Sequence, residues 1–160
     1  MSFVIIFIII IAVLFATAYF TKRRFGVLGL ALAAGGMLST LWVGDLTPII
    51  ERAGVILIAP PLKSVVAASL ILLPAVILLF SGPTYRQPLQ RIIGAAAFAM
   101  LATALLLEPL GSALVIDGVG QQVYTFFVEY KIIIITAALI LAIFDVLATK
   151  TPKHTDHSKH

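Results

Sequence analysis

The chain has no cysteine and few charged residues. Without cysteine there are no disulfides, no thiolate metal ligands and no cysteine nucleophile. Charged residues make up 11% of the 160 residues, against about 25% in soluble domains, whereas 61% are hydrophobic and the mean hydropathy is +1.14. A soluble fold of this length has too little interior to bury so much apolar surface. The composition therefore predicts that lipid surrounds most of the chain.

Motifs for phosphate binding, for Ser/His/Asp catalysis and for HExxH metalloproteases are also missing. The glycines of TKRRFGVLGLALAAGG, residues 21–36, lack the spacing of a phosphate-binding loop, and no predicted strand precedes them. His154, His157 and His160 lie three residues apart in a flexible tail, where they would bind a metal only weakly. The sequence predicts no catalytic residue, no metal site and no cofactor, and an intramembrane enzyme is the least favoured class.

Five apolar segments approach or reach the roughly 20 residues that a helix needs to cross a bilayer core of about 30 Å. They cover residues 2–20, 25–44, 64–82, 91–110 and 131–149. We predict an all-α, polytopic transmembrane bundle of five spans that forms one domain over 1–149, followed by a disordered cytoplasmic tail over 150–160. A four-span arrangement with one re-entrant segment is the alternative, because Pro74 and Pro109 interrupt spans three and four.

Basic residues are distributed unevenly between the spans. In a five-span chain, eight of the eleven lysines and arginines fall on one side: Lys22, Arg23, Arg24, Arg86, Arg91, Lys150, Lys153 and Lys159. By the positive-inside rule, this side is the cytoplasm, the N-terminus lies outside, and the chain is integral to the plasma (bacterial inner) membrane. We expect this face to attract anionic lipids, so the net charge of +4 determines topology and does not indicate nucleic-acid binding.

One connection on the predicted outer side has a helix signal of its own. Thr47 and Pro48 are suited to an N-cap and a first helical position, and Pro60 and Pro61 would end the helix that they start. The intervening apolar residues share one face of a helix. The pattern predicts a short interfacial helix over about 47–58.

Ionisable groups inside spans are costly in lipid, so Glu108 and Asp145 are candidate functional residues. Glu108 ends span four where Lys131 opens span five, and the two can form an ion pair. Asp145 follows Lys131 by 14 residues, about 21 Å along a helix, so its expected partners are Arg91, Arg86 or the cluster Lys22–Arg24. A proton or cation relay requires two acids at similar depth. These acids lie at opposite ends, so we favour structural pairs that fix helix register.

Small residues predict where helices pack closely in lipid. They recur in span two, at Gly29, Ala33 and Gly35, and in span four, at Gly94. We expect these two spans to form the packed centre and spans one and five to face lipid. The same faces are equally suited to dimerisation. Pro74 removes a backbone donor and should kink span three, either as a static bend or as a transporter hinge.

Three segments carry a family resemblance: KRRFG at 22–26, GLALAAGG at 29–36 and RIIGAAA at 91–97. Their order resembles the colicin V production protein family of small multi-span bacterial inner-membrane proteins, over roughly residues 2–108. The resemblance implies a role in export or envelope maintenance and assigns no chemistry to named residues. The chain departs from the family in having Gln90 or Gln87 where an acidic residue is expected, and in a fifth span beyond the usual four.

Two functions of different classes follow from these features. The first is a non-enzymatic scaffold, accessory subunit or envelope- or export-related factor. It acts through the lipid bilayer and through contacts with a membrane-protein partner or a second copy of the chain. The alternative is a small transporter or channel subunit that uses the kinked span at Pro74 and the carboxylate of Asp145.

Overall fold

The computed structural model describes residues 3–55, 57, 60–80, 84–85, 87–114, 116 and 118–148. It contains five helices: α1 (Phe3–Thr21), α2 (Phe25–Arg52), α3 (Leu62–Phe80), α4 (Pro88–Ala113) and α5 (Val119–Leu147). In these residues the only β pairing is an isolated bridge. Each helix is long and apolar enough to cross a membrane. The chain is therefore an all-α, five-span bundle, as predicted, and not the four-span alternative; the predicted tail over 150–160 lies outside the described residues.

Helix α2 continues well beyond the predicted end of span two at residue 44. Its 28 residues correspond to about 42 Å, more than a bilayer core requires. The predicted interfacial helix over 47–58 is wrong, because Thr47 and Pro48 lie inside α2. The Thr47 hydroxyl donates to the Val43 carbonyl at 2.6 Å, one turn back, and does not cap a new helix. The helix ends at Arg52, and the later part of the prediction falls partly on residues that the structure does not describe.

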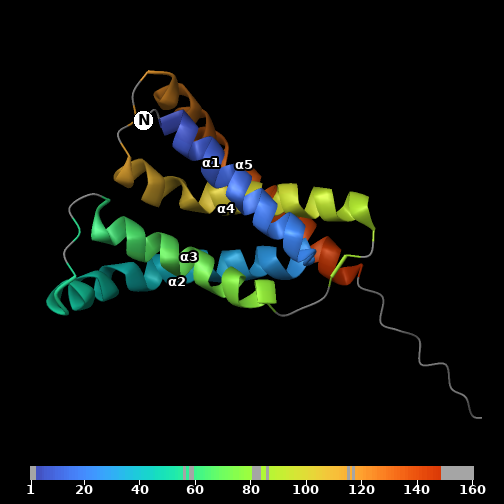
Figure 1. Cartoon of the computed structure of the whole chain (residues 1–160), viewed down its shortest axis with the longest axis horizontal. Helices are drawn as coiled ribbons and strands as arrows, with labels where there is room; N and C mark the ends of the chain where they lie inside the picture. Colours follow the sequence, from blue (N-terminus) through green and yellow to red (C-terminus); the bar gives the residue numbers. More distant parts are fainter. Residues whose placement is uncertain are drawn as a thin grey trace, which may run out of the picture.

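Helix α4 is the most buried element of the bundle. Of the residues in its apolar segment, 61% are buried, against 39% in α2 and α3 and 11% in α1 and α5. Figure 1 shows α2 and α3 running side by side, with α1 crossing over α4. The expectation that spans one and five face outward is met. The packed centre includes α3 as well as the predicted spans two and four.

The two ends of the bundle differ. At one end, which we call the capped end, α1 meets α2, α3 leads into α4, and α5 terminates. At the other, the open end, α1 and α5 begin and the α2–α3 and α4–α5 connections lie. Figure 1 shows that the α2–α3 pair diverges from α1, α4 and α5 toward the open end. This divergence creates space between the helices in one half of the molecule.

Gly35 of α2 packs against the turn of α3 that precedes Pro74. Helix α3 runs through Pro74, which has no N–H to donate to the Leu70 carbonyl. Gly35 approaches this part of α3 so closely that an added Cβ would lie 2.8 Å from the Leu70 oxygen and would collide with the Ile71 carbonyl. The missing side chain therefore lets the α2 backbone cover the carbonyl that Pro74 leaves without a donor. The predicted kink residue directly follows this packed contact.

Candidate functional site

Asp145 joins the end of α5 to the start of α2 at the capped end. Its Oδ2 accepts the backbone N–H of Gly26 at 2.8 Å. The fit is close because Gly26 has no side chain: an added Cβ would lie 2.6 Å from the Ala142 carbonyl oxygen. The first N–H groups of a helix lack intrahelical acceptors and carry partial positive charge. Asp145 thus caps α2 from another helix, whereas Arg24, at the N-cap position, makes no side-chain cap.

Tyr85, in the α3–α4 connection, completes this cap. Its hydroxyl accepts the Phe25 N–H at 3.0 Å and hydrogen-bonds to Asp145. Burial raises the pKa of Tyr85 to about 12; the Phe25 bond acts against this rise and the charge of Asp145 adds to it. The hydroxyl is therefore protonated at neutral pH and donates to the carboxylate. The sequence analysis missed Tyr85, although one signal was available: no Ser, Thr, Asp or Asn immediately precedes α2.

Two arginines at the same end cap the C-termini of helices to which they do not belong. Arg23 donates from Nε to the Leu79 carbonyl and from Nη2 to the Phe80 carbonyl, both at 3.0 Å, at the end of α3. Arg91 of α4 donates from Nε to the Tyr19 carbonyl of α1 at 2.6 Å, and its guanidinium lies 3.8 Å from the Tyr19 ring centroid. The last carbonyls of a helix lack donors and carry partial negative charge, so both cations match the ends that they cap.

The basic turn between α1 and α2 is a structural element as well as a charge cluster. Lys22 has a φ of 57°, in the left-handed region that non-glycine residues seldom adopt. Its carbonyl accepts the Tyr85 N–H at 2.9 Å, and Arg23 pairs with Thr84 in the isolated bridge. The Arg24 guanidinium lies 5.6 Å from the Tyr85 ring centroid. The α1–α2 turn and the α3–α4 connection therefore hold one another.

The ion pair between Glu108 and Lys131 is present at the opposite, open end. Lys131 Nζ donates to Glu108 Oε1 and joins α4 to α5. The Glu108 side chain is 79% exposed and that of Lys131 is 25% exposed. Pairs as accessible to solvent as this one contribute about 0–1 kcal/mol.

The predicted packing residues do not all pack against helices. Gly29 contacts α5, where an added Cβ would lie 3.1 Å from the Ala142 Cβ. Gly94 instead makes room for the Tyr85 ring, which would lie 2.6 Å from an added Cβ. Ala33 is half-buried and lines a groove. Span two therefore packs tightly at Gly29 and Gly35, and the face that includes Ala33 is more open.

A groove of about 890 Å³, here called the lateral groove, lies between α2, α3, α4 and α5. Its lining includes Ala33 and Thr40 of α2, Ser64 and Ile71 of α3, Glu108 of α4 and Lys131 of α5. The hydroxyls of Ser64 and Ser112 lie 2.8 Å apart in it and connect α3 to α4. Asp145 does not line it. The sequence analysis missed the groove because it arises from the divergence of helices.

At the capped end, charged side chains bond to the ends of helices and hold the bundle together. The other half of the molecule contains the lateral groove. Within the described ranges, no three metal-ligating side chains gather, and the tail histidines at 154, 157 and 160 lie outside those ranges. Comparison of the chain with protein-family models, with curated proteins and with solved structures finds no match.

Proposed function

We propose that this multi-pass protein is non-enzymatic and resides in the bacterial inner membrane as a scaffold, accessory subunit or envelope- or export-related factor. The observation that carries this proposal is the use of charge at the capped end. Asp145, Arg23 and Arg91 each bond to the backbone end of another helix. Such charges fix the arrangement of spans, which is what a protein that presents a constant surface to a partner requires.

The same geometry argues against the transporter alternative. A coupling carboxylate in a transporter faces a cavity or a water-filled path. Asp145 bonds to the first turn of α2 and does not line the lateral groove. Pro74, the proposed hinge, follows directly after the turn of α3 whose backbone packs against Gly35 of α2. The carboxylate that the transporter hypothesis needs is thus bonded to a helix end, and the turn before its hinge is packed.

We also propose that the N-terminus is outside and the capped end is cytoplasmic. Among the described residues, the capped end has one carboxylate, Asp145, and four cations: Lys22, Arg23, Arg24 and Arg91. The open end has three cations and four carboxylates: Arg52, Lys63, Lys131, Asp45, Glu51, Glu108 and Glu129. This asymmetry supports the orientation through the positive-inside rule. It also supports attraction of anionic lipid to the cytoplasmic face, at about 1 kcal/mol per cation.

The partner surface consists of the outward faces of α1 and α5. Large apolar residues are exposed along both helices, including Ile8 and Val13 on α1 and Ile133 and Phe144 on α5. In a membrane these faces contact lipid, a partner's spans or a second copy of the chain. When the chain is purified in mild detergent, we expect a partner protein, or a second copy of the chain, to remain bound to it at a fixed stoichiometry.

Ion flux into proteoliposomes tests the scaffold against the transporter. Vesicles that contain the wild-type chain and vesicles that contain Asp145→Asn should show the same flux as empty vesicles, and the substitution should lower only thermal stability. The scaffold function fails if the wild type conducts ions and Asp145→Asn abolishes conduction at unchanged expression. A reporter fused to the C-terminus tests the orientation separately, and a periplasmic signal would overturn it.

A further inference from the structure

The lateral groove has no part in the proposed scaffold function. Its volume of about 890 Å³ falls in the range of about 300–1,000 Å³ that small-molecule sites occupy. It lies in the half of the bundle where the α2–α3 pair separates from α4 and α5 (Figure 1). A ligand there would fill space that the protein leaves between its own helices.

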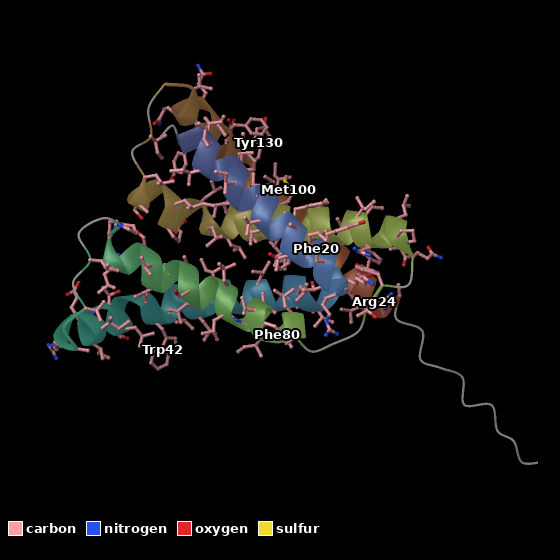
Figure 2. The ribbon with its side chains drawn as sticks, viewed as in Figure 1. Phe20, Arg24, Trp42, Phe80, Met100 and Tyr130 are labelled. Atoms are coloured by element: carbon pink, nitrogen blue, oxygen red, sulfur yellow. The ribbon has the colours of Figure 1, made fainter. Side chains whose placement is uncertain are left out.

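The groove is exposed to the flank of the bundle along its α2 wall. On its α3 and α4 walls, Ile71 and Pro109 are buried, whereas Met37 on α2 is 71% exposed. Figure 2 shows Trp42 of α2 and Tyr130 of α5 widely separated in this half of the molecule. Because the flank of a transmembrane bundle is surrounded by lipid, a molecule from the bilayer can enter without crossing water.

Polarity falls along the groove from the open end inward. Lys63 of α3 and Lys131 of α5 line its outer part. Ile71 and Leu139 line it eight residues further along the same two helices, about 12 Å deeper. Cations at the level of the membrane surface and apolar side chains beneath them match a lipid, which has a polar head and a hydrocarbon chain.

The outer part of the groove favours an anion. Glu108 is paired with Lys131, whereas no carboxylate in the described part of the chain forms a salt bridge with Lys63. Lys63 also lies in the first turn of α3, where the helix dipole disfavours a cation and attracts a negative group. A phosphate beside Lys63 would compensate both the ammonium and the helix end.

We propose that the lateral groove binds one phospholipid with an anionic headgroup, taken from the leaflet at the open end. The phosphate contacts Lys63, and one acyl chain lies along Ile71, Leu105 and Leu139. This site is distinct from the basic residues of the capped end, which lie at the other surface of the membrane. The inference requires only that the chain is membrane-embedded and does not depend on any protein partner.

A partner helix is a poorer match for the groove than a lipid. A helix is a rigid cylinder about 10 Å in diameter along its whole length, whereas the α2–α3 pair converges with α4 and α5 away from the open end (Figure 1). Helix–helix contacts in lipid also do not require cations at one end of the interface. A flexible acyl chain adapts to a short, narrowing space.

Native mass spectrometry of the purified full chain tests the proposal. The delipidated protein is titrated in detergent with palmitoyl-oleoyl phosphatidylglycerol or with palmitoyl-oleoyl phosphatidylcholine. We expect one phosphatidylglycerol per chain to bind in preference to phosphatidylcholine. Lys63→Gln should weaken phosphatidylglycerol binding about fivefold, the equivalent of about 1 kcal/mol for one cation. Ala67→Leu, which narrows the groove, should weaken binding of both lipids.

Two matched variants serve as controls. Arg52→Gln removes an exposed cation from the same end of the bundle without touching the groove, and Ala137→Leu enlarges an exposed alanine of α5 that does not line it. Both should bind phosphatidylglycerol as the wild type does. The proposal is overturned if the two lipids bind equally, if Arg52→Gln weakens binding as much as Lys63→Gln, or if the chain is a lipid-free dimer. Binding that survives both Lys63→Gln and Ala67→Leu, in variants with wild-type melting temperatures, would also overturn it.

Discussion

Asp145, near the end of α5, accepts the backbone N–H of Gly26, the second residue of α2, across 119 positions of sequence. The opposite charge is used in the same way nearby, where Arg23 and Arg91 bond to carbonyls at the ends of α3 and α1. The sign of each side chain matches the helix end that it meets. The capped end is therefore stabilised by side chains that bond to the backbone of other helices, and single substitutions there should lower stability measurably.

Removing the carboxylate of Asp145 should destabilise the start of α2. We expect Asp145→Ala to lower the free energy of unfolding by about 1–2 kcal/mol, as for the loss of an N-cap. Asp145→Asn should cost less, because its amide oxygen still accepts the Gly26 N–H. Unfolding followed by circular dichroism in detergent micelles measures both. Asp45→Ala, at an exposed position of α2, is the control, and an equal loss in that variant would contradict the prediction.

The stabilising effect of Tyr85 should disappear at high pH. Its folded pKa is about 12, above the ordinary value of 10.0. Because the folded value is the higher one, the stabilisation is fully present below pH 10 and is lost as the pH rises through 12. At neutral pH, Tyr85→Phe should cost about 1 kcal/mol, since the Phe25 N–H loses its acceptor.

Unfolding of the wild type and Tyr85→Phe, measured from pH 7 to 12, checks this dependence. The difference in free energy between the two should shrink above pH 10. Tyr130→Phe, at a residue 40% exposed, provides the comparison. A difference between wild type and Tyr85→Phe that is constant with pH would contradict the prediction, because it would mean that folding does not raise the pKa of Tyr85.

Arg91 should not be replaceable by lysine. Its guanidinium donates to the Tyr19 carbonyl and stacks over the Tyr19 ring, and the compact ammonium of lysine cannot do both. We expect Arg91→Lys to lose about 1 kcal/mol, chiefly the contact with the ring. Arg52→Lys, at an exposed residue in the last turn of α2, should be neutral. Wild-type stability in Arg91→Lys would mean that charge alone is required.

Features that depend on local composition could be predicted from the sequence. The five spans follow from hydropathy, and the basic turn at 22–24 follows from the cations between the first two spans. The pair Glu108–Lys131 was also predictable, because the predicted spans place the two residues at the same side of the membrane, although α4 and α5 extend beyond both positions. In each case, the thickness of the membrane determines how deep a residue lies, and the order of the spans determines on which side of the membrane it lies.

Features that depend on how the helices pack could not be predicted from the sequence. Tyr85 and Arg23 act on helices to which they do not belong, and no periodicity indicates such contacts. Thr47 and Pro48 have the local pattern of a helix start, but the threonine hydroxyl bonds within α2 and the helix continues. The lateral groove depends on the angle between the α2–α3 pair and α4, which one sequence does not determine.

The pair Glu108–Lys131 should contribute little to stability. A double-mutant cycle with Glu108→Gln and Lys131→Gln should give a coupling energy below about 1 kcal/mol, since the glutamate is exposed. Each free energy comes from reversible unfolding in micelles at low and at moderate salt. The coupling should weaken as salt is added. A coupling of several kcal/mol that salt does not change would instead indicate a pair shielded from solvent.

Gly35 should be the glycine of α2 least tolerant of a side chain. A Cβ there would collide with the Ile71 carbonyl, and backbone of α3 cannot move aside as a side-chain tip could. Gly35→Ala must therefore push α2 and α3 apart, which also uncovers the Leu70 carbonyl that Pro74 leaves without a donor. We expect a loss of about 1–3 kcal/mol, the usual cost of overpacking, read from the unfolding midpoint in micelles. Gly44→Ala is the matched control in the same helix, because nothing lies within 4 Å of its added Cβ, and it should be neutral or stabilising by up to about 1 kcal/mol. If the two variants were equally stable, the close approach of α2 to α3 would not hold in the membrane-embedded protein.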